Sequence, residues 1–141
     1  MNLYIDCEWD NCTHRLISIA LVPEDSRKSF WYEVFPLPRE EECDPWVWLN
    51  VIPKLSRAPI SRMEFRSSLE TYLLQFKTVH IIADWPEDIA YFCEALITGP
   101  GDRLKTPPLT MEVLRIYSTS LNPHNALADA VALRRAVETT R

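Results

Sequence analysis

Hydrophobic and polar positions alternate along the first third of the chain. Alternation with a period of two is typical of strands that bury one face. The pattern predicts strands over Asn2–Asp6, Arg15–Val22 and Phe30–Phe35. The segments between them are short, and Pro23–Ser29 is a polar turn, so the three strands are expected to form an antiparallel meander.

Helical spacing follows the meander. Asp44–Pro45 is typical of an N-cap and a first helical position, and predicts a short helix over Trp46–Ile52 that ends near Pro53. Ser61–Glu64 fits the capping-box pattern and predicts a second helix. The residues that this helix places on one side are Phe65, Leu69, Tyr72, Leu73 and Phe76.

The remaining chain alternates strands and helices. We expect strands over Val79–Ala83 and Met111–Tyr117, with a helix within Asp84–Leu96 between them. Thr98–Pro108 reads as a loop rich in glycine and proline, and a last helix begins near Asn125. This order predicts one α/β domain over residues 1–141, a mixed five-stranded sheet flanked by helices. Ligand sites in such sheets lie at strand ends.

Composition narrows the class of protein. Of 141 residues, 47% are hydrophobic and 25% are charged, which is typical of a globular domain. No apolar run approaches the roughly 20 residues of a membrane span. The acidic start has no signal-peptide pattern, and the four cysteines lack CxxC spacing, so a cytoplasmic protein with reduced thiols is expected. The net charge of −5 disfavours binding to phosphate backbones unless bound divalent metal offsets the acids.

Two acids close the first predicted strand. Asp6 and Glu8 are two residues apart, so a strand would send both side chains to the same face. Neighbouring carboxylates repel unless a cation joins them. The alternative is that the strand ends at Asp6 and leaves Glu8 in water.

Acids also follow the fourth predicted strand and interrupt the last helix. Asp84 and Asp88 flank a helix start, where acids also occur simply because the helix dipole favours them. Asp129 lies among apolar helix formers, and an unpaired carboxylate there needs a partner, such as a metal ion. Alternatively, Asp129 reaches water past small alanines. His124 precedes that helix and is either a base or a loop and capping residue.

The order of these acids indicates a metal site. All of them can converge on one end of the sheet, and carboxylate oxygens are the ligands that Mg²⁺ and Mn²⁺ prefer. The conjunction carries more weight than any single acid.

Three motifs resemble those of the DEDDh 3′–5′ exonucleases. Ile5–Glu8 (IDCE) is similar to the first motif, and Ala83–Phe92 (ADWPEDIAYF) to the second. His124–Ala130 (HNALADA) is similar to the third, a His followed five residues later by Asp. The resemblance covers Asn2 to about Val137, and Asp44–Leu55 (DPWVWLNVIPKL) is similar to small stand-alone bacterial and phage exoribonucleases of this group.

The resemblance implies a ribonuclease-H-like fold and a two-metal phosphodiesterase. Asp6, Glu8, Asp88 and Asp129 would hold two Mg²⁺ or Mn²⁺ ions, about 3.5–4 Å apart in such sites. His124 would act as general base, since imidazole changes charge near neutral pH. The implied products are nucleoside 5′-monophosphates, released from the 3′ end of single-stranded RNA or DNA, with RNA favoured. Many relatives are dimers, so a homodimer is also implied.

The second motif departs from the family pattern. Asp84 stands where many relatives have Asn, and the four-residue offset makes Asp88 the expected ligand. Asp84 would then face the substrate or support the ligands from behind. Trp9 and Trp85 lie beside the acids and either stack on a terminal base or belong to the core.

Three other functions remain open at this point. The chain could be a nuclease of the same fold that cuts internally or proofreads DNA. It could be a catalytically inactive nucleic-acid-binding module, although no expected ligand is missing. It could also be a structural protein whose acids are coincidental.

Overall fold

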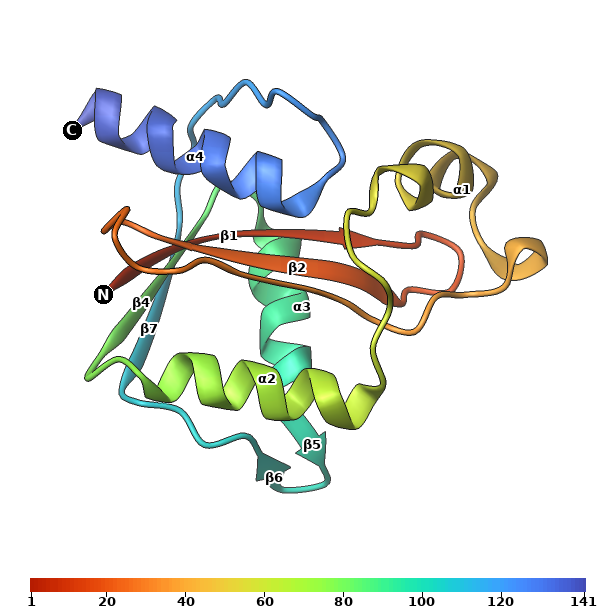
Figure 1. Ribbon diagram of the computed structural model, residues 1–141, viewed down its shortest axis with the longest axis horizontal. Coiled ribbons are helices and arrows are strands. Elements are labelled where there is room, and N and C mark those ends of the chain that lie inside the picture. Colours follow the sequence, from red (N-terminus) through yellow and green to blue (C-terminus); the bar gives the residue numbers. More distant parts are fainter.

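The computed structural model describes residues 1–141 and contains a five-stranded mixed sheet between helices (Figure 1). Its strands, in the order β3-β2-β1-β4-β7 across the sheet, are β3 (Trp31–Val34), β2 (Leu16–Pro23), β1 (Asn2–Trp9), β4 (Val79–Ala83) and β7 (Leu109–Val113). β1, β2 and β3 pair antiparallel, whereas β4 pairs parallel with both β1 and β7. The predicted α/β fold, with its meander of three strands, is confirmed.

Four helices flank the sheet: α1 (Pro45–Asn50), α2 (Arg62–Leu74), α3 (Pro86–Leu96) and α4 (Ala126–Thr140). In Figure 1, α4 lies above the sheet, α2 and α3 lie below it, and α1 lies beside one end of β1 and β2. No helix combines the length and the hydrophobicity that crossing a membrane requires.

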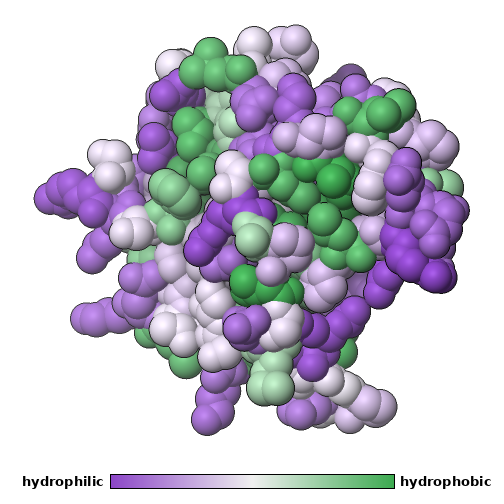
Figure 2. All heavy atoms as spheres, turned by 45° about the vertical axis from the view of Figure 1, so that its right-hand side comes forward, coloured by the Kyte–Doolittle hydropathy of each residue, from purple (hydrophilic) through white to green (hydrophobic).

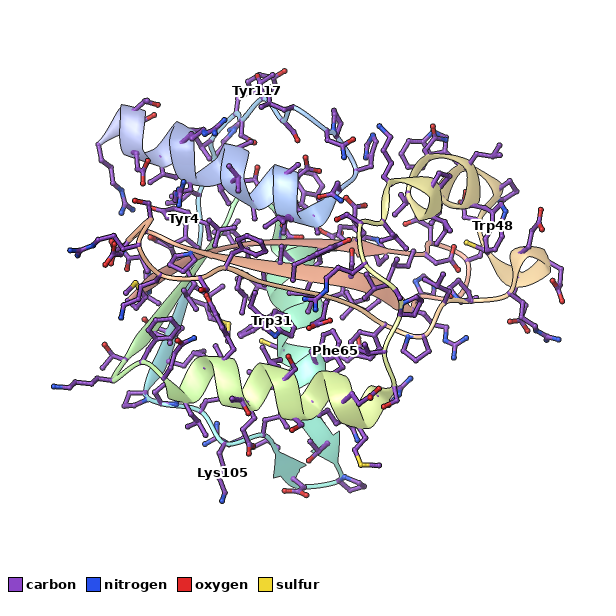
Figure 3. All side chains as sticks on the ribbon, viewed as in Figure 1. Tyr4, Trp31, Trp48, Phe65, Lys105 and Tyr117 are labelled. Atoms are coloured by element: carbon purple, nitrogen blue, oxygen red, sulfur yellow. The ribbon has the colours of Figure 1, made fainter.

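Each face of the sheet packs its own core. Leu3, Ile5 and Cys7 of β1 are buried on the side of α2 and α3, whereas Tyr4 is buried against α4. Figure 3 shows Trp31 and Phe65 between the sheet and α2, and Tyr4 on the α4 side. Because side chains alternate along β1, Asp6 and Glu8 share the α4 side with Tyr4.

Two predicted strands had the wrong limits. β1 continues to Trp9, because β2 pairs with it as far as Trp9 across from Leu16. The alternative in which the strand ends at Asp6 is therefore excluded. The last strand runs over Leu109–Val113 rather than Met111–Tyr117, since its partner β4 ends where Ala83 pairs with Val113.

Two segments contain more regular structure than the sequence indicated. The first part of the predicted loop Thr98–Pro108 belongs to a small hairpin of β5 (Ile97–Gly99) and β6 (Asp102–Arg103), and Gly101 takes the positive φ of 69° in its turn. The segment before α1 includes a 3₁₀ turn, Glu40–Glu42. The helix predicted over Trp46–Ile52 ends at Asn50, and the chain continues as the 3₁₀ turn Ile52–Lys54, which accommodates Pro53 at its start.

Candidate metal centre

The parallel pairing of β1 and β4 places their carboxyl ends at one edge of the sheet. Asp6 and Glu8 lie at that end of β1, and Asp84 directly follows β4. This is the edge at which open α/β sheets bind ligands. Three of the predicted acids are therefore neighbours because of strand order alone.

α3 brings a fourth acid to the same edge. Pro86 occupies the first turn, where its missing N–H has no consequence, and the helix then presents Asp88 to the end of β1. Oδ1 of Asp88 accepts a hydrogen bond of 2.9 Å from the backbone N–H of Cys7. Asp88 is only 2% exposed, and its Oδ2 is buried without a hydrogen-bond partner.

α4 contributes the fifth acid. The side chain of Asn125 caps this helix by accepting a 3.0 Å hydrogen bond from the N–H of Ala128. Asp129 then lies in the first turn, and its Oδ2 accepts a 3.0 Å hydrogen bond from the backbone N–H of His124. Asp129 thereby ties the predicted base to the acid cluster, while its Oδ1 is buried without a partner.

The five acids form two groups that share one member. Asp6, Asp84 and Asp88 each offer an oxygen within 4.8 Å of the others, and so do Asp6, Glu8 and Asp129. Asp6 is therefore placed to bridge two cations. The sequence led us to expect that Asp84 faces the substrate or supports the metal ligands. The structure also places a carboxylate oxygen of Asp84 close enough to those of Asp6 and Asp88 for all three to bind one cation.

Crowding and burial disfavour charge on these acids. Burial, reinforced by the nearby Asp88 and Glu8, raises the pKa of Asp6 well above its ordinary value. Burial also raises the pKa of Glu8 to about 8, with Asp129 adding to the effect. Burial raises the pKa of Asp88 to about 8, although the Cys7 hydrogen bond opposes the shift, and burial raises the pKa of Asp84.

Unpartnered carboxylate oxygens make this cluster suitable for hard divalent cations. Oδ2 of Asp6 is buried without a partner, as are Oδ2 of Asp88 and Oδ1 of Asp129. Buried carboxylate oxygens are ordinarily hydrogen-bonded or bound to cations. The residues present therefore fit Mg²⁺ or Mn²⁺, which favour oxygen ligands.

The other predicted site residues lie around the same pocket, whose volume is about 370 Å³. Trp9, Trp85 and His124 all line it. Trp9 stacks on Tyr91 with ring centroids 5.0 Å apart, whereas Trp85 is 57% exposed. All the residues proposed from the sequence are thus brought together, and Trp9 also belongs to the edge of the core.

Sequence reasoning missed Trp46. It is 51% exposed on α1, and its ring meets the ring of His124 edge-on, at 4.9 Å between centroids. The carbonyl of Lys54, just after α1, accepts a 2.8 Å hydrogen bond from the side chain of Asn125. The segment from α1 to Lys54 therefore fixes both His124 and the cap of α4. The Asp44–Pro45 cap predicts a helix in this segment, but neither the cap nor the resemblance of Asp44–Leu55 indicates which residues the helix contacts.

A buried carboxylate holds α1 in this place. Asp10 is fully buried and accepts 2.7 Å hydrogen bonds from the N–H groups of Thr13 and Asp44, as well as one from the Thr13 hydroxyl. Burial by itself would raise the pKa of Asp10, but these hydrogen bonds and one from Cys12 outweigh it and lower the pKa to about 2. Asp10 thus joins the β1–β2 turn to the start of α1.

Replacing Asp10 by alanine is expected to lower the free energy of unfolding by about 2–4 kcal/mol, because buried N–H donors lose their acceptor. Urea denaturation followed by tryptophan fluorescence measures the change. Asp25→Ala is the matched control, since the side chain of Asp25 accepts hydrogen bonds only from Arg27, which is exposed. Equal losses in both variants would contradict the structural role of Asp10.

No family model matches the sequence, and comparison with curated proteins gives no match.

Proposed function

We propose that this protein is a metal-dependent 3′–5′ exonuclease that acts on single-stranded nucleic acid, with RNA as the favoured substrate. The observation that carries the proposal is the shared carboxylate of Asp6, which belongs to both groups of three acids at ligand distance. Two cations about 3.5–4 Å apart are the arrangement that phosphodiester hydrolysis uses in many nucleases. The three sequence motifs supply the same residues in the same order.

The acids would hold two divalent cations, Mg²⁺ or Mn²⁺. Asp6, Asp84 and Asp88 are the candidate ligands for one, and Asp6, Glu8 and Asp129 for the other. When bound, the cations would acidify the attacking water and neutralise charge on the departing 3′ oxygen. In the hydrolysis, a P–O bond to water forms and the P–O3′ bond breaks, which releases a nucleoside 5′-monophosphate.

His124 is the candidate base for the proton that the water loses. Its side chain lines the pocket of the acids, and Asp129 fixes its backbone. The backbone of His124 has a φ of 69°, so the residue lies in the left-handed region, at the turn that leads into α4. The ring of Trp46 packs nearly perpendicular to the His124 ring and limits the orientation of that ring.

Replacing His124 by asparagine is expected to lower kcat by about 10²–10⁴-fold, the range for loss of a general base. Asparagine tolerates a positive φ better than alanine does, so the turn is preserved. Titration calorimetry with Mn²⁺ should give an unchanged affinity, because no acid is altered. A drop in Mn²⁺ affinity that matches the loss of kcat would contradict the role as base.

Exposed aromatic faces beside the acids favour a single-stranded substrate. Trp46 and Trp85 line the pocket of the acids, and each leaves about half of its surface exposed. Figure 2 shows hydrophobic groups exposed among hydrophilic ones on the side of the molecule that carries α1. Bases of a single strand stack on such rings with little regard to sequence, whereas the paired bases of a duplex are not free to do so.

The test uses 5′-labelled single-stranded RNA and DNA of one sequence, incubated with Mg²⁺ or Mn²⁺, and with EDTA as a control. The expected result is a ladder that shortens from the 3′ end, faster for RNA, and that disappears in EDTA. Faster digestion of DNA would support a proofreading-type exonuclease instead. Binding without hydrolysis under every metal would support the inactive binding module. We also propose that the protein is cytoplasmic, as expected from the sequence.

A further inference from the structure

A second pocket lies next to the acid cluster and has the opposite charge. Its volume is about 480 Å³, and Arg15, Arg62 and Arg66 line it with one acid, Glu94. Such a concentration of cations is unexpected in a chain whose net charge is −5. We call it the arginine pocket.

The arginines of this pocket have no carboxylate partner. Five of the eleven arginines in the chain form ion pairs: Arg27, Arg39, Arg57, Arg134 and Arg141. Of the six others, three line this one pocket. Their N–H donors are therefore available to a ligand, and guanidinium groups match phosphate oxygens in geometry and charge.

Aromatic rings lie beside these cations. The guanidinium of Arg62 sits over the ring of Phe35, 5.8 Å from its centroid, and Phe35 and Tyr91 both line the pocket. Cationic and aromatic side chains together are the combination that binds single-stranded nucleic acid.

The arginine pocket adjoins the acid cluster through one wall. Tyr91 lines the arginine pocket and stacks on Trp9, which lines the pocket of the acids. Helix α3 also joins the two pockets: Asp88 lines the pocket of the acids, and Ala95 lines the arginine pocket. Seven residues of helix span ~10 Å along the axis.

We propose that the arginine pocket binds the phosphate backbone of the substrate strand upstream of the 3′ nucleotide held at the acids. This inference rests on the proposed function and adds to it how much of the substrate strand the protein binds. Phosphates of a stacked strand recur every ~3.4 Å, so the pocket meets the strand about three nucleotides from its 3′ end. The pocket therefore explains how an acidic protein retains a polyanion beyond the metal site.

The test measures binding with the double variant Arg62→Gln/Arg66→Gln. Both residues are on α2, and glutamine has nearly the helix propensity of arginine, so the helix is preserved. The matched control is Lys28→Gln/Arg135→Gln, which removes the same charge from two exposed cations that form no ion pair and do not line the pocket. The probe is a fluorescent single-stranded RNA decamer, followed by anisotropy in Ca²⁺ over a series of salt concentrations.

The double variant is expected to bind the decamer at least ~10-fold more weakly than wild type. The slope of log affinity against log salt should fall in magnitude by ~1.4, since each phosphate contact in a single strand contributes ~0.7. The control variant should match the wild type in both. In Mg²⁺, KM for the decamer should rise in the double variant, while hydrolysis of a dinucleotide, too short to reach the pocket, should be unchanged.

The outcomes separate this inference from the proposed function. Arginine-dependent binding without hydrolysis supports the pocket and rejects the exonuclease. Hydrolysis of the decamer that is insensitive to Arg62 and Arg66 overturns the pocket and leaves the exonuclease standing. Equal weakening in the control variant, or no binding by the wild type, also overturns the pocket.

Discussion

Asp6→Asn is expected to abolish hydrolysis and, without metal at pH 8, to make the folded protein more stable. Both effects have one cause. Asp6 belongs to both groups of acids at ligand distance, so its loss removes a ligand from each candidate cation. The same carboxylate is crowded by Asp88 and Glu8, and burial disfavours its charge.

The loss of activity should be at least ~10³-fold in kcat, the scale on which essential groups of a hydrolytic site act. Asparagine has the shape of aspartate, and its amide can donate to the neighbouring carboxylates, so the fold is expected to persist. In EDTA at pH 8, Tm should rise by about 5 °C, because the like-charge repulsion is reduced. Oligonucleotide digestion and thermal melting measure the two effects.

Glu87→Gln is the matched control for Asp6→Asn. Glu87 is exposed in the first turn of α3 and adjoins Asp88, but it belongs to neither group of acids. The control should keep its activity and its Tm. A lower Tm for Asp6→Asn in EDTA would show that Asp6 has a structural role, and retained activity would end the two-metal proposal.

The metal-free protein is expected to lose stability as the pH rises from about 5 to about 9. Glu8 and Asp88 have pKa values of about 8 in the folded state, well above the ordinary values of 4.5 and 3.8. Within that window the folded state therefore binds more protons than the unfolded state. Their contribution to stability is complete below pH ~4 and is lost as the pH passes through ~8.

Asp10 has the opposite effect on the stability of the protein at low pH. Its pKa is lowered to about 2, so its contribution to stability is present above pH ~4 and is lost below it. The metal-free protein should thus be most stable near pH ~4–5. Thermal melts in EDTA across this range measure the profile.

Divalent cations should remove the alkaline part of this profile. Mn²⁺ at pH 8 would take the place of the protons on the acids, and Tm should return to its value near pH 5 or exceed it. A matched melt in K⁺ at equal ionic strength controls for screening. A metal-free Tm that is flat or rises between pH 5 and 9 would contradict the crowding of these acids.

Local signals in the sequence predicted the helix starts well. Asp44 accepts hydrogen bonds from the N–H groups of Trp46 and Val47, as its place before Pro45 indicated. Ser61 and Glu64 form both bonds of the predicted capping box. A cap depends on residues within one turn of each other, so the sequence contains all the information that is needed.

Strand limits depended on partners far along the chain and were predicted less well. β7 ends at Val113 although apolar residues continue to Tyr117, because β4 has no residue left to pair with them. Alternation predicts which face a residue takes, but it does not predict where the neighbouring strand ends.

The sequence predicted that the acids converge, but it did not predict the contacts that hold the surrounding segments in place. Strand order and alternation were sufficient to bring Asp6, Glu8 and Asp84 together. The contact of Trp46 with His124 joins two segments whose proximity no periodicity predicts. The same holds for Asp10, whose carboxylate looks like an ordinary turn residue until Asp44 is seen to donate to it.

The parallel pairing of β1 with β4 has a consequence for the order of folding. It sets Asn2 opposite His80, so the chain between them must close a long loop before the acids can meet. Such distant contacts form late, because the entropy of loop closure opposes them. We therefore expect the repulsion among the acids to be weaker in the folding transition state than in the native state. Repulsion of this kind raises the rate of unfolding and has little effect on the rate of folding. The acid cluster is therefore expected to shorten the time for which the metal-free protein stays folded.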